Sequence, residues 1–64
     1  MWLRVTMKNR PVMINGDLVQ RIVEVPGAEA GERGCHLYVS MTDYIAVDQS
    51  LHEIMISLGF EERQ

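Results

Sequence analysis

The chain contains 64 residues with nine acidic and six basic side chains, a net charge of −3 and a single cysteine. This length fits one small domain, and the lone Cys35 excludes an internal disulfide. The few bases are scattered, which disfavours binding to nucleic acid, and no apolar run is long enough to span a membrane.

The size of the chain also limits its stability. A single core in a domain of this length rarely contributes more than about 3–5 kcal/mol. With neither a disulfide nor a supported metal site, we expect a homo-oligomer to supply further stability. Arg4 and Lys8 interrupt any apolar export signal at the start of the chain. We therefore expect a cytoplasmic location without membrane insertion.

Two short strands are predicted first. Residues 2–7 alternate, with Leu3, Val5 and Met7 on one face, which is the period of a strand. Turn-forming residues follow, and a second short strand is predicted over 11–14, because Pro11 fits the first position of a strand. The next three residues, Asn15, Gly16 and Asp17, form a turn-structural group in which Asn and Gly tolerate positive φ.

A third strand is predicted over residues 18–25. A helix is the alternative, since Leu18, Arg21, Ile22 and Val25 would share one helical face. The β-branched residues and the extended geometry imposed before Pro26 favour the strand. Residues 26–34 are then rich in glycine and predict a mobile hairpin loop.

A late hairpin and a helix complete the predicted order. Residues 35–41 alternate, with Cys35, Leu37, Val39 and Met41 inward and His36, Tyr38 and Ser40 outward. Thr42-Asp43 is predicted as a tight connection to a strand over 44–48. A helix is predicted over 50–58, because Ser50 and Glu53 have the capping-box spacing and Leu51, Ile54, Met55 and Leu58 form one apolar stripe. Phe60 is expected to fold back on its last turn.

These elements predict a single mainly β (α+β) domain over residues 1–64. We expect a small antiparallel β-meander or SH3-like partial barrel of about five short strands with one C-terminal α-helix. The apolar stripe of that helix must dock on the sheet, because a helix this short is marginal alone.

Reactive side chains are few. Cys35, His36 and His52 are the set that could suggest a metal site, but adjacent strand residues face opposite sides, so Cys35 and His36 could not easily bind one ion. Packing is the favoured role of Cys35. We expect no catalytic residues, no cofactor and no enzymatic activity.

Exposed aromatic residues are the better candidates for function. Trp2 and Tyr38 fall opposite the core-facing positions of their strands, and Tyr44 and Met13 are added to them as protein-contact candidates. The alternative is that a sister chain covers these side chains in a homo-oligomer.

The order of motifs resembles the flagellar FlbD family, also called the swarming motility protein SwrD family. Val5-Thr6 with Asn9 is similar to its opening strand and turn, and the segment from Ile14 to Val19 is similar to its central Leu-Asn-Pro-Asp-Leu-Ile. The matching positions further on are Ile22, Glu24, Pro26, Leu37-Tyr38-Val39, Tyr44-Ile45-Ala46-Val47 and Asp48-Gln49-Ser50. Arg10 in place of the turn glycine, Gly16 in place of proline, and the long loop over 26–34 depart from the family pattern.

The resemblance covers residues 3–58 and implies a non-enzymatic accessory protein that supports flagellar motor function or swarming. It implies a protein partner in the motor or its stator complex, and it carries over no catalytic residue. Two other functions remain open from the residues alone. One is a small homodimeric regulatory module that binds RNA or protein, and the other is a metal-binding accessory protein that uses Cys35, His36 and His52.

Overall fold

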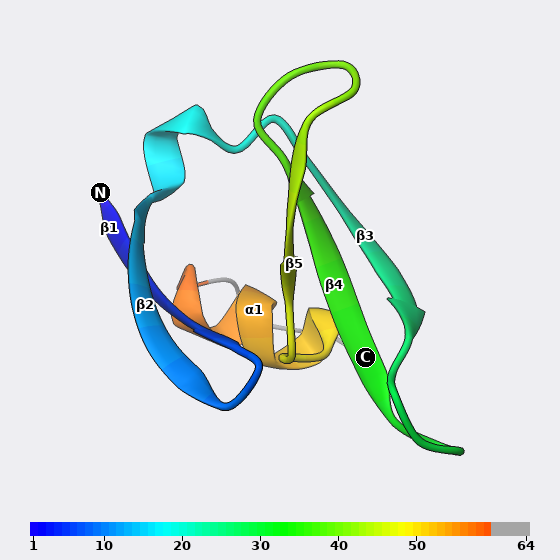
Figure 1. The fold of residues 1–64 in the computed structure, drawn as a ribbon. Helices are drawn as coiled ribbons and strands as arrows, with labels where there is room; N and C mark the ends of the chain where they lie inside the picture. Colours follow the sequence, from blue (N-terminus) through cyan, green and yellow to red (C-terminus); the bar gives the residue numbers. More distant parts are fainter. Residues whose placement is uncertain (60–64) are drawn as a thin grey trace, which may run out of the picture.

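The computed structural model describes residues 1–59 (Figure 1). In this part of the chain, segments of alternating apolar residues form five short strands, and one helix follows them. The elements in chain order are β1 (Trp2–Met7), β2 (Arg10–Asn15), the 3-10 turn η1 (Gly16–Leu18), β3 (Arg21–Pro26), β4 (Arg33–Tyr38), β5 (Tyr44–Val47) and α1 (Leu51–Ser57). The mainly β class with a C-terminal helix is thus confirmed. Phe60 lies outside the described residues.

The strands form two antiparallel sheets of sequential neighbours. One sheet has the order β1-β2 and the other the order β3-β4-β5. The end of β5 meets β1, where the backbone N–H of Asp48 donates to the carbonyl of Thr6 at 2.7 Å. Helix α1 lies across the lower end of the space between the sheets in the view of Figure 1. No helix in residues 1–59 is long and apolar enough to cross a membrane.

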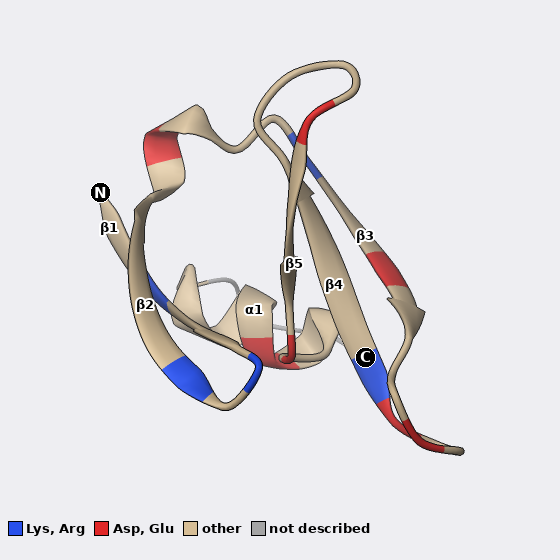
Figure 2. Cartoon of the chain, viewed as in Figure 1, with Lys and Arg blue, Asp and Glu red and all other residues tan. Residues whose placement is uncertain are grey.

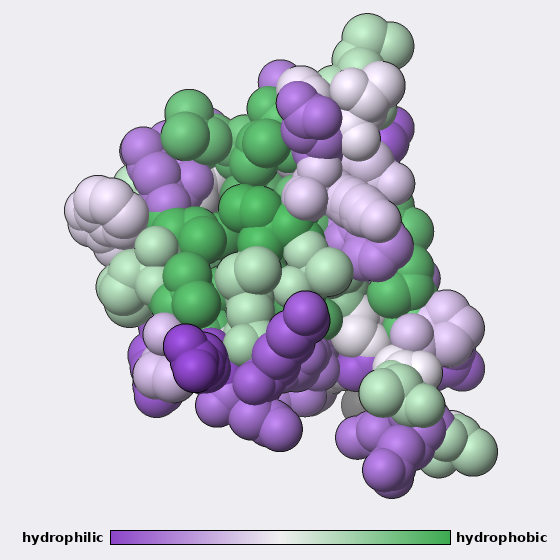
Figure 3. Space-filling view, viewed as in Figure 1, coloured by the Kyte–Doolittle hydropathy of each residue, from purple (hydrophilic) through white to green (hydrophobic). Residues whose placement is uncertain are grey.

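The core is small and draws on both sheets and the helix. Within residues 1–59 its buried side chains are Leu3, Val5, Cys35, Leu37, Val47 and Ile54. Partly buried apolar side chains surround them, and Figure 3 shows such side chains at the surface between the hairpin and β5. The buried core is therefore bordered on this side by apolar side chains that are partly exposed.

Helix α1 is fixed at its start by side chains. The Ser50 hydroxyl accepts from the N–H of Glu53, and the Glu53 carboxylate accepts from the N–H of Ser50, so the predicted capping box is present. Glu24 of β3 adds a link, because its Oε2 accepts from the N–H of Leu51 at 2.9 Å. The first turn of the helix is thereby tied to the edge of the larger sheet. Gly59 follows the helix with left-handed backbone geometry (φ 84°), which is common after the last turn of a helix.

The segment that leads into the helix also holds the β1–β2 hairpin. The Gln49 side chain accepts from the Thr6 N–H at 2.9 Å and donates to the Thr6 hydroxyl at 3.3 Å. The Asp48 carboxylate accepts from the N–H of Asn9 at 2.9 Å. These bonds give the smaller sheet a fixed position beside β5.

Two predicted strands are shorter than the sequence indicates. The strand expected over 18–25 begins at Arg21, because the Asn15 side chain accepts from the Asp17 N–H and caps η1 instead. The strand expected over 35–41 ends at Tyr38, and the prediction that Met41 faces inward is wrong, since Met41 is 87% exposed. The connection to β5 is longer than Thr42-Asp43 because Ser40 Oγ accepts from the N–H groups of both residues.

The glycine-rich loop is also narrower than predicted. Pro26 ends β3 and Arg33 begins β4, which leaves residues 27–32 as the connection. The N–H of Gly27 donates to the carbonyl of Glu32 at 2.8 Å, and this bond closes the loop. Gly34 belongs to β4, where a Cβ atom would lie 2.7 Å from the Val47 carbonyl oxygen, so the position admits no side chain without a shift of β5.

We expect Ile54→Ala to lower the free energy of unfolding by about 2–4 kcal/mol, because Ile54 is fully buried between the sheets. Ile56→Ala is the matched control on the same helix, since Ile56 is 59% exposed, and its cost should stay within about 0.5 kcal/mol. Urea unfolding of both variants tests this. Equal stability of the two variants would mean that α1 does not close the core.

A substitution in the β1–β2 turn is expected to stabilise the protein. Lys8 (φ 50°) and Asn9 (φ 65°) both adopt positive φ, which is the geometry of a type I′ turn and favours Asn over Lys at the first position. We expect Lys8→Asn to raise the free energy of unfolding by about 0.5–1 kcal/mol. Arg10→Asn, one position beyond the turn in the extended β2, should give no gain. Thermal unfolding measures both, and a Lys8→Asn variant no more stable than Arg10→Asn contradicts the turn assignment.

Candidate functional site

The outer surface of the β3-β4-β5 sheet gathers side chains from all three strands. The register places Arg21 opposite Tyr38 and Tyr38 opposite Tyr44, so these three side chains form one row. The next row on the same face contains Val23, His36 and Ala46. Ile22, Leu37 and Ile45 alternate with them and point into the core. We call the two outer rows, Arg21, Val23, His36, Tyr38, Tyr44 and Ala46, the aromatic face.

The rings of the aromatic face are in mutual contact. Tyr38 and Tyr44 stack with centroids 5.3 Å apart at an interplanar angle of 19°. The Arg21 guanidinium carbon lies 4.0 Å from the centre of the Tyr38 ring, a cation–π distance. His36 leans toward β5, with its ring centroid 4.0 Å from that of Tyr44 and 6.5 Å from that of Tyr38. Cross-strand contacts of this kind hold the rings in place before any partner binds.

Much of this face is open to solvent. Tyr44 is 46% exposed, Arg21 and Ala46 are exposed, and Tyr38 and His36 are half-buried by their neighbours. A hollow of about 530 Å³ adjoins the rows at His36 and Ala46 and continues to Lys8 of the β1–β2 turn. The face therefore combines ordered rings with a concave border, an arrangement suited to contact with a macromolecule.

The four predicted contact residues do not form one surface. Tyr38 and Tyr44 lie together on the aromatic face, whereas Trp2 and Met13 lie on the outer side of the β1–β2 hairpin. Trp2 is 69% exposed and Met13 is 56% exposed. Arg21 was not among the predicted contact residues, because its position beside Tyr38 depends on the pairing of β3 with β4, which a single strand pattern does not give.

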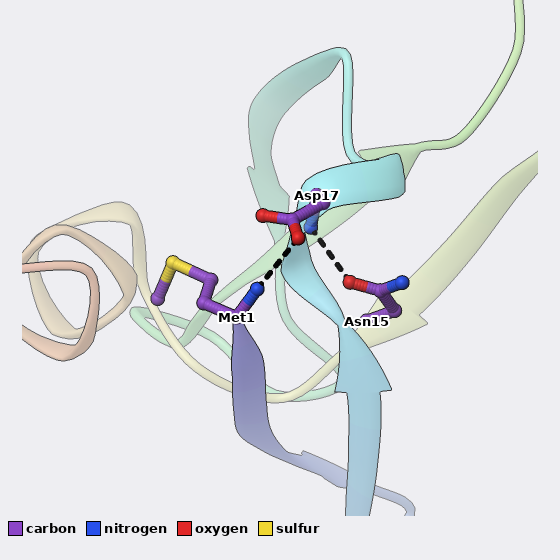
Figure 4. A network of polar contacts seen from close by, with 3 residues as sticks. All are labelled: Met1, Asn15 and Asp17. Atoms are coloured by element: carbon purple, nitrogen blue, oxygen red, sulfur yellow. Dashed lines mark hydrogen bonds and ion pairs between the residues drawn. The ribbon is translucent and has the colours of Figure 1, made fainter.

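The predicted turn group Asn15, Gly16 and Asp17 connects the hairpin to β3 (Figure 4). Asn15 Oδ1 accepts from the Asp17 N–H at 3.0 Å, and the amino group of Met1 donates to Asp17 Oδ2 at 2.7 Å. A Cβ atom on Gly16 would lie 3.1 Å from the Met1 side chain. The turn thus anchors the first strand, and the exposed ion pair itself adds little energy.

The candidate metal ligands Cys35, His36 and His52 do not form a metal site within residues 1–59. Cys35 is buried on the inner face of β4, while His36 points outward on the aromatic face. In the part of the chain that the structure describes, no three His, Cys, Asp or Glu side chains are grouped so that they could hold a metal ion. Burial raises the pKa of the Cys35 thiol above its ordinary value of 9.0, and the nearby carboxylates of Glu24 and Glu53 raise this pKa further.

Comparison of the chain with protein-family models, curated proteins and solved structures gives no match. We therefore infer a function from the side chains themselves and from the arrangement of the outer surfaces of the two sheets.

The raised pKa of Cys35 predicts a loss of stability in alkali. The native protein keeps the thiol proton at pH values where the unfolded chain loses it. The contribution of Cys35 to the free energy of unfolding is therefore complete below pH 9.0 and declines as the pH rises above that value. Urea unfolding across this range should show a steeper decline for the wild type than for Cys35→Ala. Parallel pH profiles for the two proteins would contradict the assigned shift.

Proposed function

We propose that the protein is a non-enzymatic accessory module that binds another protein through the aromatic face. The observation that carries this proposal is the stacked row of Arg21, Tyr38 and Tyr44 on a solvent-facing sheet. Tyr and Arg are enriched among the residues that dominate binding energy in protein interfaces. Rings that already contact one another lose little conformational freedom on binding, which favours affinity.

A protein partner suits this face better than a nucleic acid. A site for single-stranded nucleic acid combines aromatic side chains with several bases that track the phosphates. Arg21 is the sole Lys or Arg in the two rows, and Glu24 and Asp43 lie in or beside the strands that form them. The net charge of −3 opposes a polyanion further.

The resemblance of residues 3–58 to the flagellar FlbD and swarming motility family supplies the biological setting. On this basis we propose that the protein acts in the cytoplasm and that its partner is a component of the flagellar motor or stator. The central Asn15, Gly16 and Asp17 turn, on which the resemblance partly rests, acts in this proposal as the support that positions the hairpin.

The proposal predicts a motility phenotype that depends on the aromatic face. Deletion of the gene in a motile host should reduce the swarm diameter and leave the growth rate unchanged. The wild-type gene should restore swarming, and Tyr44→Ala should not, because loss of a central interface tyrosine costs about 2 kcal/mol of binding free energy.

Met41→Ala is the matched control, since Met41 is exposed in the β4–β5 connection and lies off the aromatic face. It should restore swarming fully. The thermal unfolding of purified Tyr44→Ala separates lost binding from lost folding. Normal swarming of the deletion strain would overturn the motility setting, and full rescue by a folded Tyr44→Ala protein would overturn the role of the aromatic face.

A further inference from the structure

A second outer surface lies on the β1–β2 hairpin, away from the aromatic face. Leu3 and Val5 point into the core, so Trp2 and Arg4 point outward from β1. The register pairs Arg4 with Met13 and Trp2 with Asn15, which places Met13 beside Arg4 and diagonal to Trp2. We call Trp2, Arg4 and Met13 the hairpin face. All three side chains are exposed.

Charge is segregated between this hairpin and the rest of the protein. Residues 1–16 contain Arg4, Lys8 and Arg10 and no acidic side chain, whereas residues 17–59 carry seven acids and two bases. Figure 2 shows basic residues along β1, its turn and the start of β2, and acidic residues mostly on η1, the later strands, their connections and α1. Within residues 1–59 no carboxylate forms an ion pair with Arg4; the recorded pair joins Met1 and Asp17.

We propose that the hairpin face binds an acidic segment of a partner protein. Arg4 supplies a planar fork of donors that fits a carboxylate. Trp2 and Met13 flank Arg4 on this face, and they would exclude water from such a contact once a partner covers them. Trp2 and Met13 supply the apolar area, and Lys8 and Arg10 at the turn attract negative charge over a longer range.

Charge complementarity distinguishes this occupant from others. A second copy bound face to face in a two-fold contact would bring the bases of two hairpins together, which costs energy. A nucleic acid would contact the three basic side chains of the hairpin on one side, and the acidic remainder of the protein would repel its phosphates on the other. The proposal concerns a different sheet from the aromatic face and does not depend on the function proposed above.

Trp2 is the sole tryptophan of the chain and therefore reports directly on this face. The probe is a synthetic peptide that alternates Glu and Leu, and the matched control peptide has Lys in place of Glu. Titration of the full-length protein with the acidic peptide should shift the Trp2 emission to shorter wavelength, because the exposed indole leaves water. The Lys peptide should give no shift, and added salt should weaken the response to the acidic one.

Two charge-reversal variants locate the binding site. Arg4→Glu should lower the affinity for the acidic peptide by about tenfold, because the substitution places like charges in contact. Arg33→Glu makes the same change of net charge at an exposed position of β4, and its effect should stay within about twofold. Circular dichroism confirms that both variants remain folded before titration.

Oligo-dT and phosphatidylserine vesicles serve as the other anionic probes. A stronger response of Trp2 to either of them than to the acidic peptide would overturn the proposal in favour of a nucleic acid or a lipid surface. Equal losses in Arg4→Glu and Arg33→Glu would overturn it as well, since the attraction would then depend on net charge alone. No shift with the acidic peptide at millimolar concentration would also overturn it.

Discussion

The structure depends on the burial of Ile54 between two sheets that have little backbone pairing between them. The β1–β2 hairpin and the β3-β4-β5 sheet each satisfy their own ladders, and the backbone bond from Asp48 to Thr6 links them beyond the end of β5. What holds the sheets in one body is apolar contact among Leu3, Val5, Leu37 and Ile54, supported by the Gln49 contacts with Thr6. Because the core contains so few side chains, each of them contributes a larger share of the free energy of unfolding than it would in a larger domain.

Sequence patterns predict two kinds of element in this chain: strands with one apolar and one polar face, and a helix whose capping residues are close in sequence. The alternation of residues 2–7 matches β1, and Cys35 and Leu37 face inward while His36 and Tyr38 face outward, as expected. The capping box of α1 was readable because Ser50 and Glu53 are three residues apart. Errors arose where side chains compete with the strand ladder for backbone groups. The Asn15 side chain caps η1, and the Ser40 hydroxyl accepts a backbone hydrogen bond in the connection after β4. Neither interaction changes the alternation of apolar residues, so the alternation does not predict where these strands begin or end.

The candidate surfaces were predicted as single residues rather than as groups. Alternation alone shows that Tyr38 points outward, but its stacking on Tyr44 and its contact with Arg21 follow from the pairing register of three strands. Trp2 and Met13 are contact candidates as well, but they lie on the other sheet, together with Arg4. The signal that could have separated them is the distribution of charge, because the first sixteen residues carry bases and no acid.

The position of the aromatic side chains gives a physical reason to favour a binding function. In residues 1–59 the core contains Leu, Val, Ile and Cys, while Trp2, Tyr38 and Tyr44 all lie on outer faces. A buried aromatic side chain removes about 150–250 Å² from water, which corresponds to about 4–6 kcal/mol. Before the entropy cost of ordering the side chain is subtracted, this gross contribution is comparable with the net stability of about 3–5 kcal/mol that a domain of this size has. Stability alone would favour such side chains inside, so their placement on two outer faces supports the proposed contacts with partners, in which the same area would be buried on binding.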